Sequence, residues 1–176
     1  PSGYAGRVFL FNNYSPNPIW IYTDVRDEVS NIDMSDDGSL IACATYGPMD
    51  HSTSDFFVFR KQSNVPLIEL NTPGSLEYVD MNGDGSLCIT SGKAVHVREM
   101  GWGGNAYCIY STPTNWGTIS GNITLHGSND NSGVKVSLKD IDDYYEFTNE
   151  DGNYKIKYIP EGTYNVKISK VGYEPI

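Results

Sequence analysis

The chain has 176 residues and a formal net charge of −10, with 18 Gly, 9 Pro, 13 Tyr and only 19% charged residues. This composition favours a turn-rich β-protein over a helical one, with room for one large domain or two small ones. The negative charge argues against nucleic-acid partners, and no apolar run reaches the roughly 20 residues of a membrane helix. We therefore expect neither nucleic-acid binding nor membrane insertion, and we expect Pro1 to begin a processed or excerpted chain.

A sequence repeat occupies the first two-thirds of the chain. Residues 32–40 (IDMSDDGSL) return 47 positions later as residues 79–87 (VDMNGDGSL). In each copy an Asp-Gly pair, ending at Gly38 or Gly85, separates two apolar segments. Glycine tolerates the positive φ of a tight turn, so each copy predicts two short strands joined by a hairpin. A repeat of this length with several short strands predicts sheets that stack on one another.

The aromatic segments of the repeat, residues 8–11 (VFLF) and 56–59 (FFVF), are apolar at every position. A strand of this kind is stable only when both of its faces are covered. We therefore expect both segments to lie inside the stack of sheets.

The pattern of residues 18–23, 29–32, 35–40 and 56–59 resembles one blade of the WD-repeat-like and quinoprotein-like β-propellers. The resemblance covers residues 4–112, although the Trp-Asp signature and its histidine partner are missing. It implies an all-β fold containing a partial β-propeller of about two four-stranded blades. Closed propellers have about 4 to 8 blades, so the remaining blades would come from a longer protein or from other chains.

The polar, proline-containing stretch at residues 111–117 predicts a domain boundary between residues 1–113 and residues 114–176. Beyond it, apolar and polar residues alternate along four segments, a pattern typical of antiparallel strands with one dry face. The predicted dry faces consist of Ile119, Gly121, Ile123 and Leu125; of Val134, Val136 and Leu138; of Tyr154, Ile156 and Tyr158; and of Tyr164, Val166 and Ile168. We therefore predict a small antiparallel β-sandwich.

Five segments of this region form a further pattern: residues 117–121, 133–136, 148–154, 159–164 and 171–173. In these segments residues 117–176 resemble the carboxypeptidase regulatory-like, or transthyretin-like, domain. It implies a sandwich of prealbumin-like type that lacks its final strand. Because an unfilled sheet edge exposes backbone groups, we expect that strand to be disordered, cut off, or supplied by a neighbouring chain through strand addition.

One turn of the repeat contains the opening of an EF-hand-like calcium loop. Asp80, Asn82 and Asp84 stand at alternate positions, followed by Gly85 as the sixth residue. The twelfth position holds Ser91 instead of the bidentate glutamate. We favour a plain hairpin turn, with a calcium site at these three residues as the alternative.

Two sequons and three cysteines bear on the compartment of the protein. Asn13 and Asn122 begin Asn-X-Ser/Thr sequons and would accept glycans in an exported protein. Cys43, Cys88 and Cys108 form no CxxC pair and lie among apolar strand residues, so we expect buried thiols. A Cys88–Cys108 disulfide is the alternative.

No catalytic motif stands out. His51, His96 and His126 are scattered, and the glycine-rich residues 101–106 precede a predicted strand instead of the helix that a dinucleotide site requires. The acidic, aromatic run at residues 140–146 is interpreted as a solvated turn, with cation or sugar binding as the alternative. We expect no enzymatic activity and no cofactor other than the calcium alternative.

Taken with the two resemblances, these observations predict a non-catalytic structural or adhesive protein, extracellular or at the cell surface. Its partners would be proteins, including further copies in a fibre or surface layer. One rival interpretation is an accessory binding region of a larger secreted hydrolase. The other is a ligand-sensing propeller, which needs enough blades to close a ring.

Overall fold

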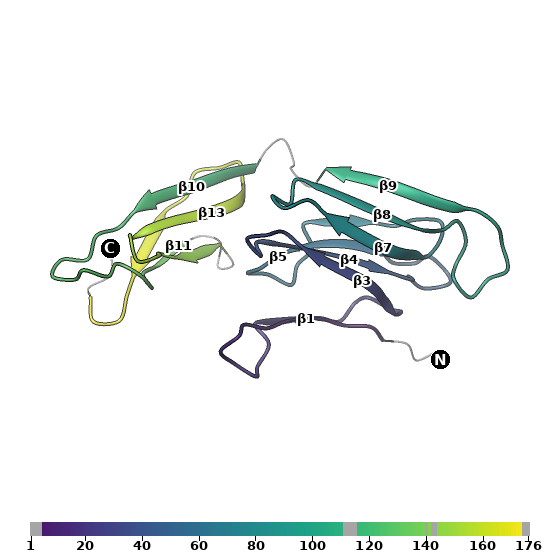
Figure 1. The fold of residues 1–176 in the computed structure, drawn as a ribbon, viewed down its shortest axis with the longest axis horizontal. Helices are drawn as coiled ribbons and strands as arrows, with labels where there is room; N and C mark the ends of the chain where they lie inside the picture. Colours follow the sequence, from purple (N-terminus) through teal and green to yellow (C-terminus); the bar gives the residue numbers. More distant parts are fainter. Residues whose placement is uncertain (1–4, 111–115, 140, 142–143, 174–176) are drawn as a thin grey trace. The chain divides into compact units, whose positions relative to one another are not determined.

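The structure is a computed structural model that describes residues 5–110, 116–139, 141 and 144–173 (Figure 1). Within these residues the chain is all-β: fourteen strands form five small antiparallel sheets, and no helix is present. The chain divides into two compact units, residues 1–111 and 112–176. The predicted boundary between residues 113 and 114 lies outside the described residues.

The N-terminal unit contains three sheets that follow one another along the chain. The first sheet pairs β1 (Val8–Leu10) with β2 (Trp20–Tyr22). The second sheet has the order β3-β4-β5-β6 and consists of β3 (Val29–Met34), β4 (Leu40–Thr45), β5 (Phe56–Arg60) and β6 (Ile68–Leu70). The third sheet has the order β7-β8-β9 and consists of β7 (Leu76–Met81), β8 (Leu87–Lys93) and β9 (Gly104–Tyr110). Every neighbouring pair is antiparallel and consecutive in sequence, so each sheet is a meander.

The sequence repeat is a structural repeat. Met34 pairs with Ile41 in the β3–β4 hairpin, and Met81 pairs with Cys88 at the same place in the β7–β8 hairpin, with a register shift at equivalent positions in both. The predicted turns are confirmed, because Gly38 has a φ of 65° and Gly85 a φ of 72°. The two hairpins are therefore copies of one unit.

The β1–β2 pair repeats the outer half of the second sheet. Val8 pairs with Tyr22 in β1–β2, and Phe56 pairs with Leu70 in β5–β6. Both residues of the second pair lie 48 positions after the corresponding residues of the first pair. The first sheet thus corresponds to the third and fourth strands of the complete sheet.

The second sheet is the middle layer of the N-terminal unit. Every residue of β4 and β5 is buried. Figure 1 shows β1 on one side of this sheet and β7–β9 on the other. We call the side toward β1–β2 the back face and the side toward β7 the front face. The back face and the strands that cover it share one hydrophobic cluster, formed by Val8, Trp20, Val25, Ile41, Cys43, Phe57 and Phe59.

Burial of the two aromatic segments differs. Residues 56–59 are 0–1% exposed, as predicted. The prediction is wrong for residues 8–11, because Phe9 is 44% exposed and Phe11 is 51% exposed. Val8 packs onto the second sheet, but no described strand covers the opposite face of β1.

Side chains of β3 hold the edge of β7 in place. The Asn31 Oδ1 atom accepts a hydrogen bond from the Val79 N–H at 3.2 Å, and the Asp33 Oδ2 atom accepts one from the Met81 N–H at 2.6 Å. The Ser30 hydroxyl lies 2.8 Å from the Leu76 carbonyl oxygen. These bonds connect consecutive sheets at positions fixed by the repeat.

The cysteines only partly follow the prediction. Cys43 and Cys88 are buried, but Cys108 is exposed, and all three are free. Cys88 pairs with Ile109, whereas Cys108 pairs with Ile89, so Cys88 and Cys108 lie on opposite faces of the third sheet. The alternative of a Cys88–Cys108 disulfide is therefore wrong.

The C-terminal unit contains two small sheets. β10 (Trp116–Asn122) pairs with β13 (Asn153–Pro160), while β12 (Tyr145–Phe147), β11 (Lys135–Leu138) and β14 (Val166–Ser169) form the other sheet in that order. Its hydrophobic cluster contains Val136, Leu138, Tyr144, Ile156 and Ile159.

One predicted dry face, that of Tyr154, Ile156 and Tyr158, is wrong at its last residue because of a β-bulge. Ile119 pairs with Ile156, and Gly117 pairs with Ile159, so β13 contains one extra residue between these pairs. Tyr158 has a φ of 57° at this bulge. The extra residue changes the alternation, so Ile159 is buried in place of the predicted Tyr158.

Candidate functional site

The predicted calcium ligands take part in a hairpin turn. The Asn82 Oδ1 atom accepts a hydrogen bond from the Leu87 N–H at 2.8 Å, and the Asp84 Oδ1 atom accepts one from the Ser86 N–H at 2.9 Å. Asp80 directly precedes Met81 in β7 and is exposed. The first copy of the turn makes the same kind of bonds without the calcium ligand set. The geometry is therefore that of the hairpin turn that we favour, and calcium binding stays an untested alternative.

The two sequon asparagines lie in different settings. Asn13 is exposed between β1 and β2. Asn122 is exposed in β10, but its Nδ2 atom donates to the Asp151 carbonyl at 2.7 Å and to the Asn153 Oδ1 atom at 3.0 Å. A glycan on Asn122 would replace one of the Nδ2 hydrogens that make these two hydrogen bonds. Asn13 is therefore the more accessible acceptor, and glycosylation stays a prediction.

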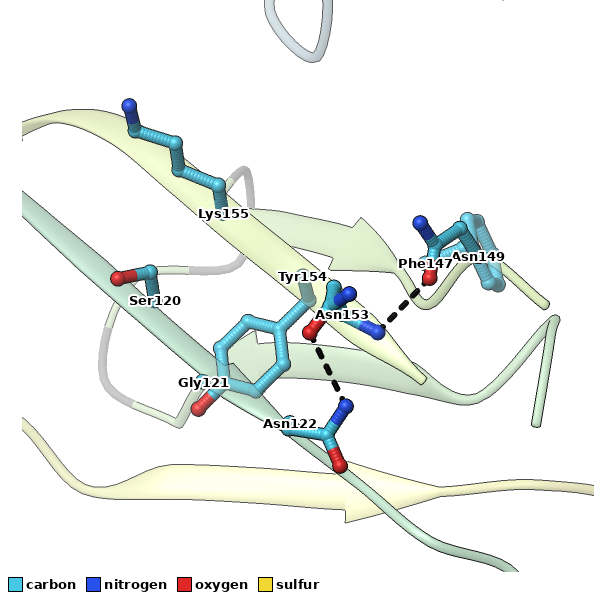
Figure 2. Close-up of a pocket in the computed structure, with 8 residues that line it drawn as sticks. All are labelled: Ser120, Gly121, Asn122, Phe147, Asn149, Asn153, Tyr154 and Lys155. Atoms are coloured by element: carbon cyan, nitrogen blue, oxygen red, sulfur yellow. Dashed lines mark hydrogen bonds between the residues drawn. The ribbon is translucent and has the colours of Figure 1, made fainter. Parts of the chain in front are cut away.

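A shallow groove of about 670 Å³ lies on the C-terminal unit (Figure 2). It is lined by Ser120, Gly121 and Asn122 of β10, by Asn153, Tyr154 and Lys155 of β13, and by Phe147 and Asn149 at the end of β12. The lining residues of β10 and β13 face each other in register, with Asn122 paired with Asn153. Sequence analysis missed this groove because three separate strands form it.

Three asparagine amides are arranged along the groove in a fixed order. The Asn149 Oδ1 atom accepts a hydrogen bond from the Asn153 N–H at 2.8 Å, and the Asn153 Oδ1 atom accepts the bond from Asn122 (Figure 2). These bonds fix the amide orientations, because oxygen and nitrogen atoms have distinct roles. They leave the Nδ2 atoms of Asn149 and Asn153 and the Oδ1 atom of Asn122 for a ligand that both donates and accepts hydrogen bonds.

Aromatic and basic side chains complete the groove. The Phe147 ring is 54% exposed, and the Tyr154 ring covers Gly121, where a Cβ atom would lie 2.8 Å from the tyrosine hydroxyl oxygen. Lys155 is the single charged side chain among the lining residues. An exposed ring beside several amides is suited to a ligand with both C–H faces and hydroxyl groups.

A buried polar cluster in the N-terminal unit contains an Asp–His pair that the sequence did not reveal. The His96 Nε2 atom lies 3.0 Å from the Gly47 carbonyl oxygen and 3.4 Å from Asp27 Oδ2, while its Nδ1 atom accepts the Arg98 N–H. Arg98 binds both carboxylate oxygens of Asp27. Burial alone raises the pKa of Asp27, but its bonds to Arg98 and to the Glu28 N–H outweigh burial and lower it. His96 is fully buried, so the cluster ties loops together instead of facing a substrate.

A second buried carboxyl group, that of Asp55, contacts a threonine hydroxyl group that also contacts a backbone carbonyl oxygen. The Thr72 hydroxyl contacts Asp55 Oδ2 and lies 2.8 Å from the Gly74 carbonyl oxygen, and the Thr72 N–H donates to Asp55 Oδ1. A hydroxyl group has one hydrogen, so only a protonated Asp55 lets both contacts be hydrogen bonds. Burial raises the pKa of Asp55 to about 6, although the bonds from Thr72 oppose that shift.

We expect an Asp55→Asn substitution to stabilise the protein above pH 6. The folded pKa of about 6 exceeds the ordinary aspartate value of 3.8, so the stability supplied by this group is full below pH 4 and is lost as the pH rises through 6. Asparagine keeps the acceptor for Thr72 N–H and supplies the missing hydrogen. Urea unfolding should show a gain of about 1–3 kcal/mol at pH 7.5 that disappears at pH 4, with Glu99→Gln as an exposed control. A loss of stability at pH 7.5 would contradict a site that favours the protonated form of the Asp55 carboxyl group.

The described residues define an all-β protein of several small antiparallel sheets with an open groove on its second unit. Comparison with known proteins gave no matching family model, no similar curated protein and no similar solved structure. Among the described residues, no helix has the length and apolar character needed to cross a membrane.

Proposed function

We propose that this chain is a non-catalytic adhesive and structural protein of the cell surface or extracellular space, and that its C-terminal groove binds neutral carbohydrate. In this proposal the N-terminal sheets are propeller-type blades, and the C-terminal unit is a sandwich of the carboxypeptidase regulatory-like kind. The four-stranded meander of β3–β6, followed by its repeat in β7–β9, supports the first assignment. The alternating buried residues of β11 support the second.

The groove is the observation that carries the proposal. Sugar hydroxyl groups donate and accept hydrogen bonds, as do the ordered amides of Asn122, Asn149 and Asn153. The C–H face of a sugar ring can pack on the exposed Phe147 ring. Because no carboxylate lines the groove, an uncharged ligand meets no like-charge repulsion there, and the groove's open form suits a chain of sugars.

Affinity electrophoresis of the 176-residue chain through gels that contain neutral polysaccharides tests this function. We expect retardation by at least one β-linked glucan or galactan, and loss of most of it in Asn153→Ala and Phe147→Ala. Both residues are exposed, so these changes should alter the free energy of unfolding by about 1 kcal/mol or less. Lys167→Ala, an exposed residue of β14 outside the groove, is the matched control. Equal retardation of all three variants, or migration unaffected by any polysaccharide, would contradict carbohydrate binding here.

Strand addition is the second part of the proposed assembly. β12 and β14 are the edge strands of their three-stranded sheet, and β14 is the last strand among the described residues. An edge strand presents a row of backbone donors and acceptors that another chain can pair with. A strand from a neighbouring chain at β14 would fill the position that the resemblance leaves open.

A further inference from the structure

The first sheet of the N-terminal unit is half of a sheet. β1 and β2 have the register of β5 and β6, the third and fourth strands of the complete sheet. In the complete sheet, β4 pairs with the other edge of β5. Among residues 5–110, no strand pairs with the corresponding edge of β1. The positions that β3 and β4 occupy in the complete sheet are therefore open beside β1.

The open positions leave one strip of apolar surface uncovered. Ile32 and Met34 lie on the back face of β3, on the same face as the buried Cys43. They are 51% and 47% exposed, whereas the equivalent residues of β7, Val79 and Met81, are 8% and 7% exposed. The difference has a simple cause: β3 and β4 pack against β7, whereas within residues 5–110 no second hairpin packs in this way against β3.

We infer that the edge of β1 together with the strip formed by Ile32 and Met34 is the docking site of a β-hairpin that carries the same repeat. The contact between β3–β4 and β7 within this chain is the template. The hairpin's second strand would pair with β1, as β4 pairs with β5. Its front face would cover Ile32 and Met34, as the β3–β4 front face covers Val79 and Met81.

The template specifies the chemistry of the hairpin. The front-face residues Leu40, Ala42 and Ala44 are fully buried, so the partner must present small and aliphatic side chains there. A carboxylate at the position of Asp33 in the partner would accept the backbone N–H of Met34, as Asp33 accepts that of Met81. At present the Met34 N–H donates to the carboxylate of its own neighbour, Asp33, at 2.8 Å.

A chain with an added hairpin tests the site directly. A copy of residues 29–48 is joined to Pro1 of the 176-residue chain, so that the connection into β1 has the same ten-residue length as residues 46–55. Linkage is needed because an isolated hairpin is only marginally stable and a short link raises its effective concentration. The readouts are the exposure of the Ile32 and Met34 methyl groups to a soluble paramagnetic agent, followed by NMR, and the melting temperature.

We expect the added copy to remove most of the paramagnetic effect at Ile32 and Met34, to leave Ile89 on the opposite outer face unchanged, and to raise Tm by roughly 4–8 °C. The same copy carrying Ala42→Asp and Ala44→Asp should change neither readout. Unchanged exposure of both methyl groups with the intact copy would overturn the inference. Protection of both groups in the unextended chain, with dimers in sedimentation, would assign the strip to a second copy and would also overturn it. None of these results depends on carbohydrate binding by the groove.

Discussion

Replacing Phe57 with alanine is expected to cost about 3–5 kcal/mol of unfolding free energy, because it opens a cavity in a fully packed core. Phe57 is 1% exposed, and its ring lies 5.2 Å from the Tyr22 ring and 6.0 Å from the Phe59 ring. Urea unfolding followed by tryptophan fluorescence measures the loss, since Trp20 belongs to the same cluster.

The matched control for Phe57 is the equivalent position of the first sheet. Phe9 lies 48 positions earlier, on the outer face of β1, where it is 44% exposed. Phe9→Ala is expected to cost about 1 kcal/mol or less, since little surface is removed from a packed environment. Equal losses in the two variants would mean that the second sheet is not the covered layer.

Replacing Gly152 with alanine is expected to cost roughly 3 kcal/mol or more of unfolding free energy in the C-terminal unit. The cost has two sources: the positive φ of this residue and a close contact of the added Cβ atom. Gly152 has a φ of 83°, and a Cβ atom there would lie 2.1 Å from the Ile123 carbonyl oxygen. The backbone must move to remove that contact. This movement would disturb the bond from the Ile123 N–H to the Gly152 carbonyl oxygen, which is 2.9 Å long.

Gly127→Ala separates the two sources of strain. Gly127 has a φ of 82°, but a Cβ atom there has no neighbour within 4 Å. It should therefore show only the backbone cost of roughly 1–2 kcal/mol. Thermal unfolding followed through the methyl signals of Val136 and Ile156, in the core of the unit, compares the variants. A Gly152→Ala variant no less stable than Gly127→Ala would contradict the close contact with Ile123.

Local patterns predicted the strands and hairpins well. The Asp-Gly turns ending at Gly38 and Gly85 and the alternation of Val134, Val136 and Leu138 follow from short-range chemistry, and the structure confirms them. The 47-residue repeat predicted a stack of sheets, which the bonds from β3 to β7 confirm within the N-terminal unit. Whether these sheets belong to a propeller remains a proposal.

The features that sequence analysis missed depend on what lies across a strand or at its end. Phe9 and Phe57 have the same local sequence setting, and only the number of neighbouring strands decides which one is buried. Tyr158 does not take its predicted inward position because β13 contains a one-residue bulge. The alternation of apolar residues does not reveal such a bulge. Asp27 and His96 lie 69 positions apart in the sequence, so no local motif could have paired them.

Amide hydrogen exchange at β7 tests the stacking of repeated sheets most directly. β7 is an edge strand, and its Val79 and Met81 N–H groups donate to side chains of β3. We expect both amides to exchange ~100-fold or more slowly than in an unfolded peptide, and Asp33→Ala to accelerate exchange at Met81 selectively. Exchange of both amides at unfolded-peptide rates, while the amides of β8 remain protected, would contradict the stacked arrangement.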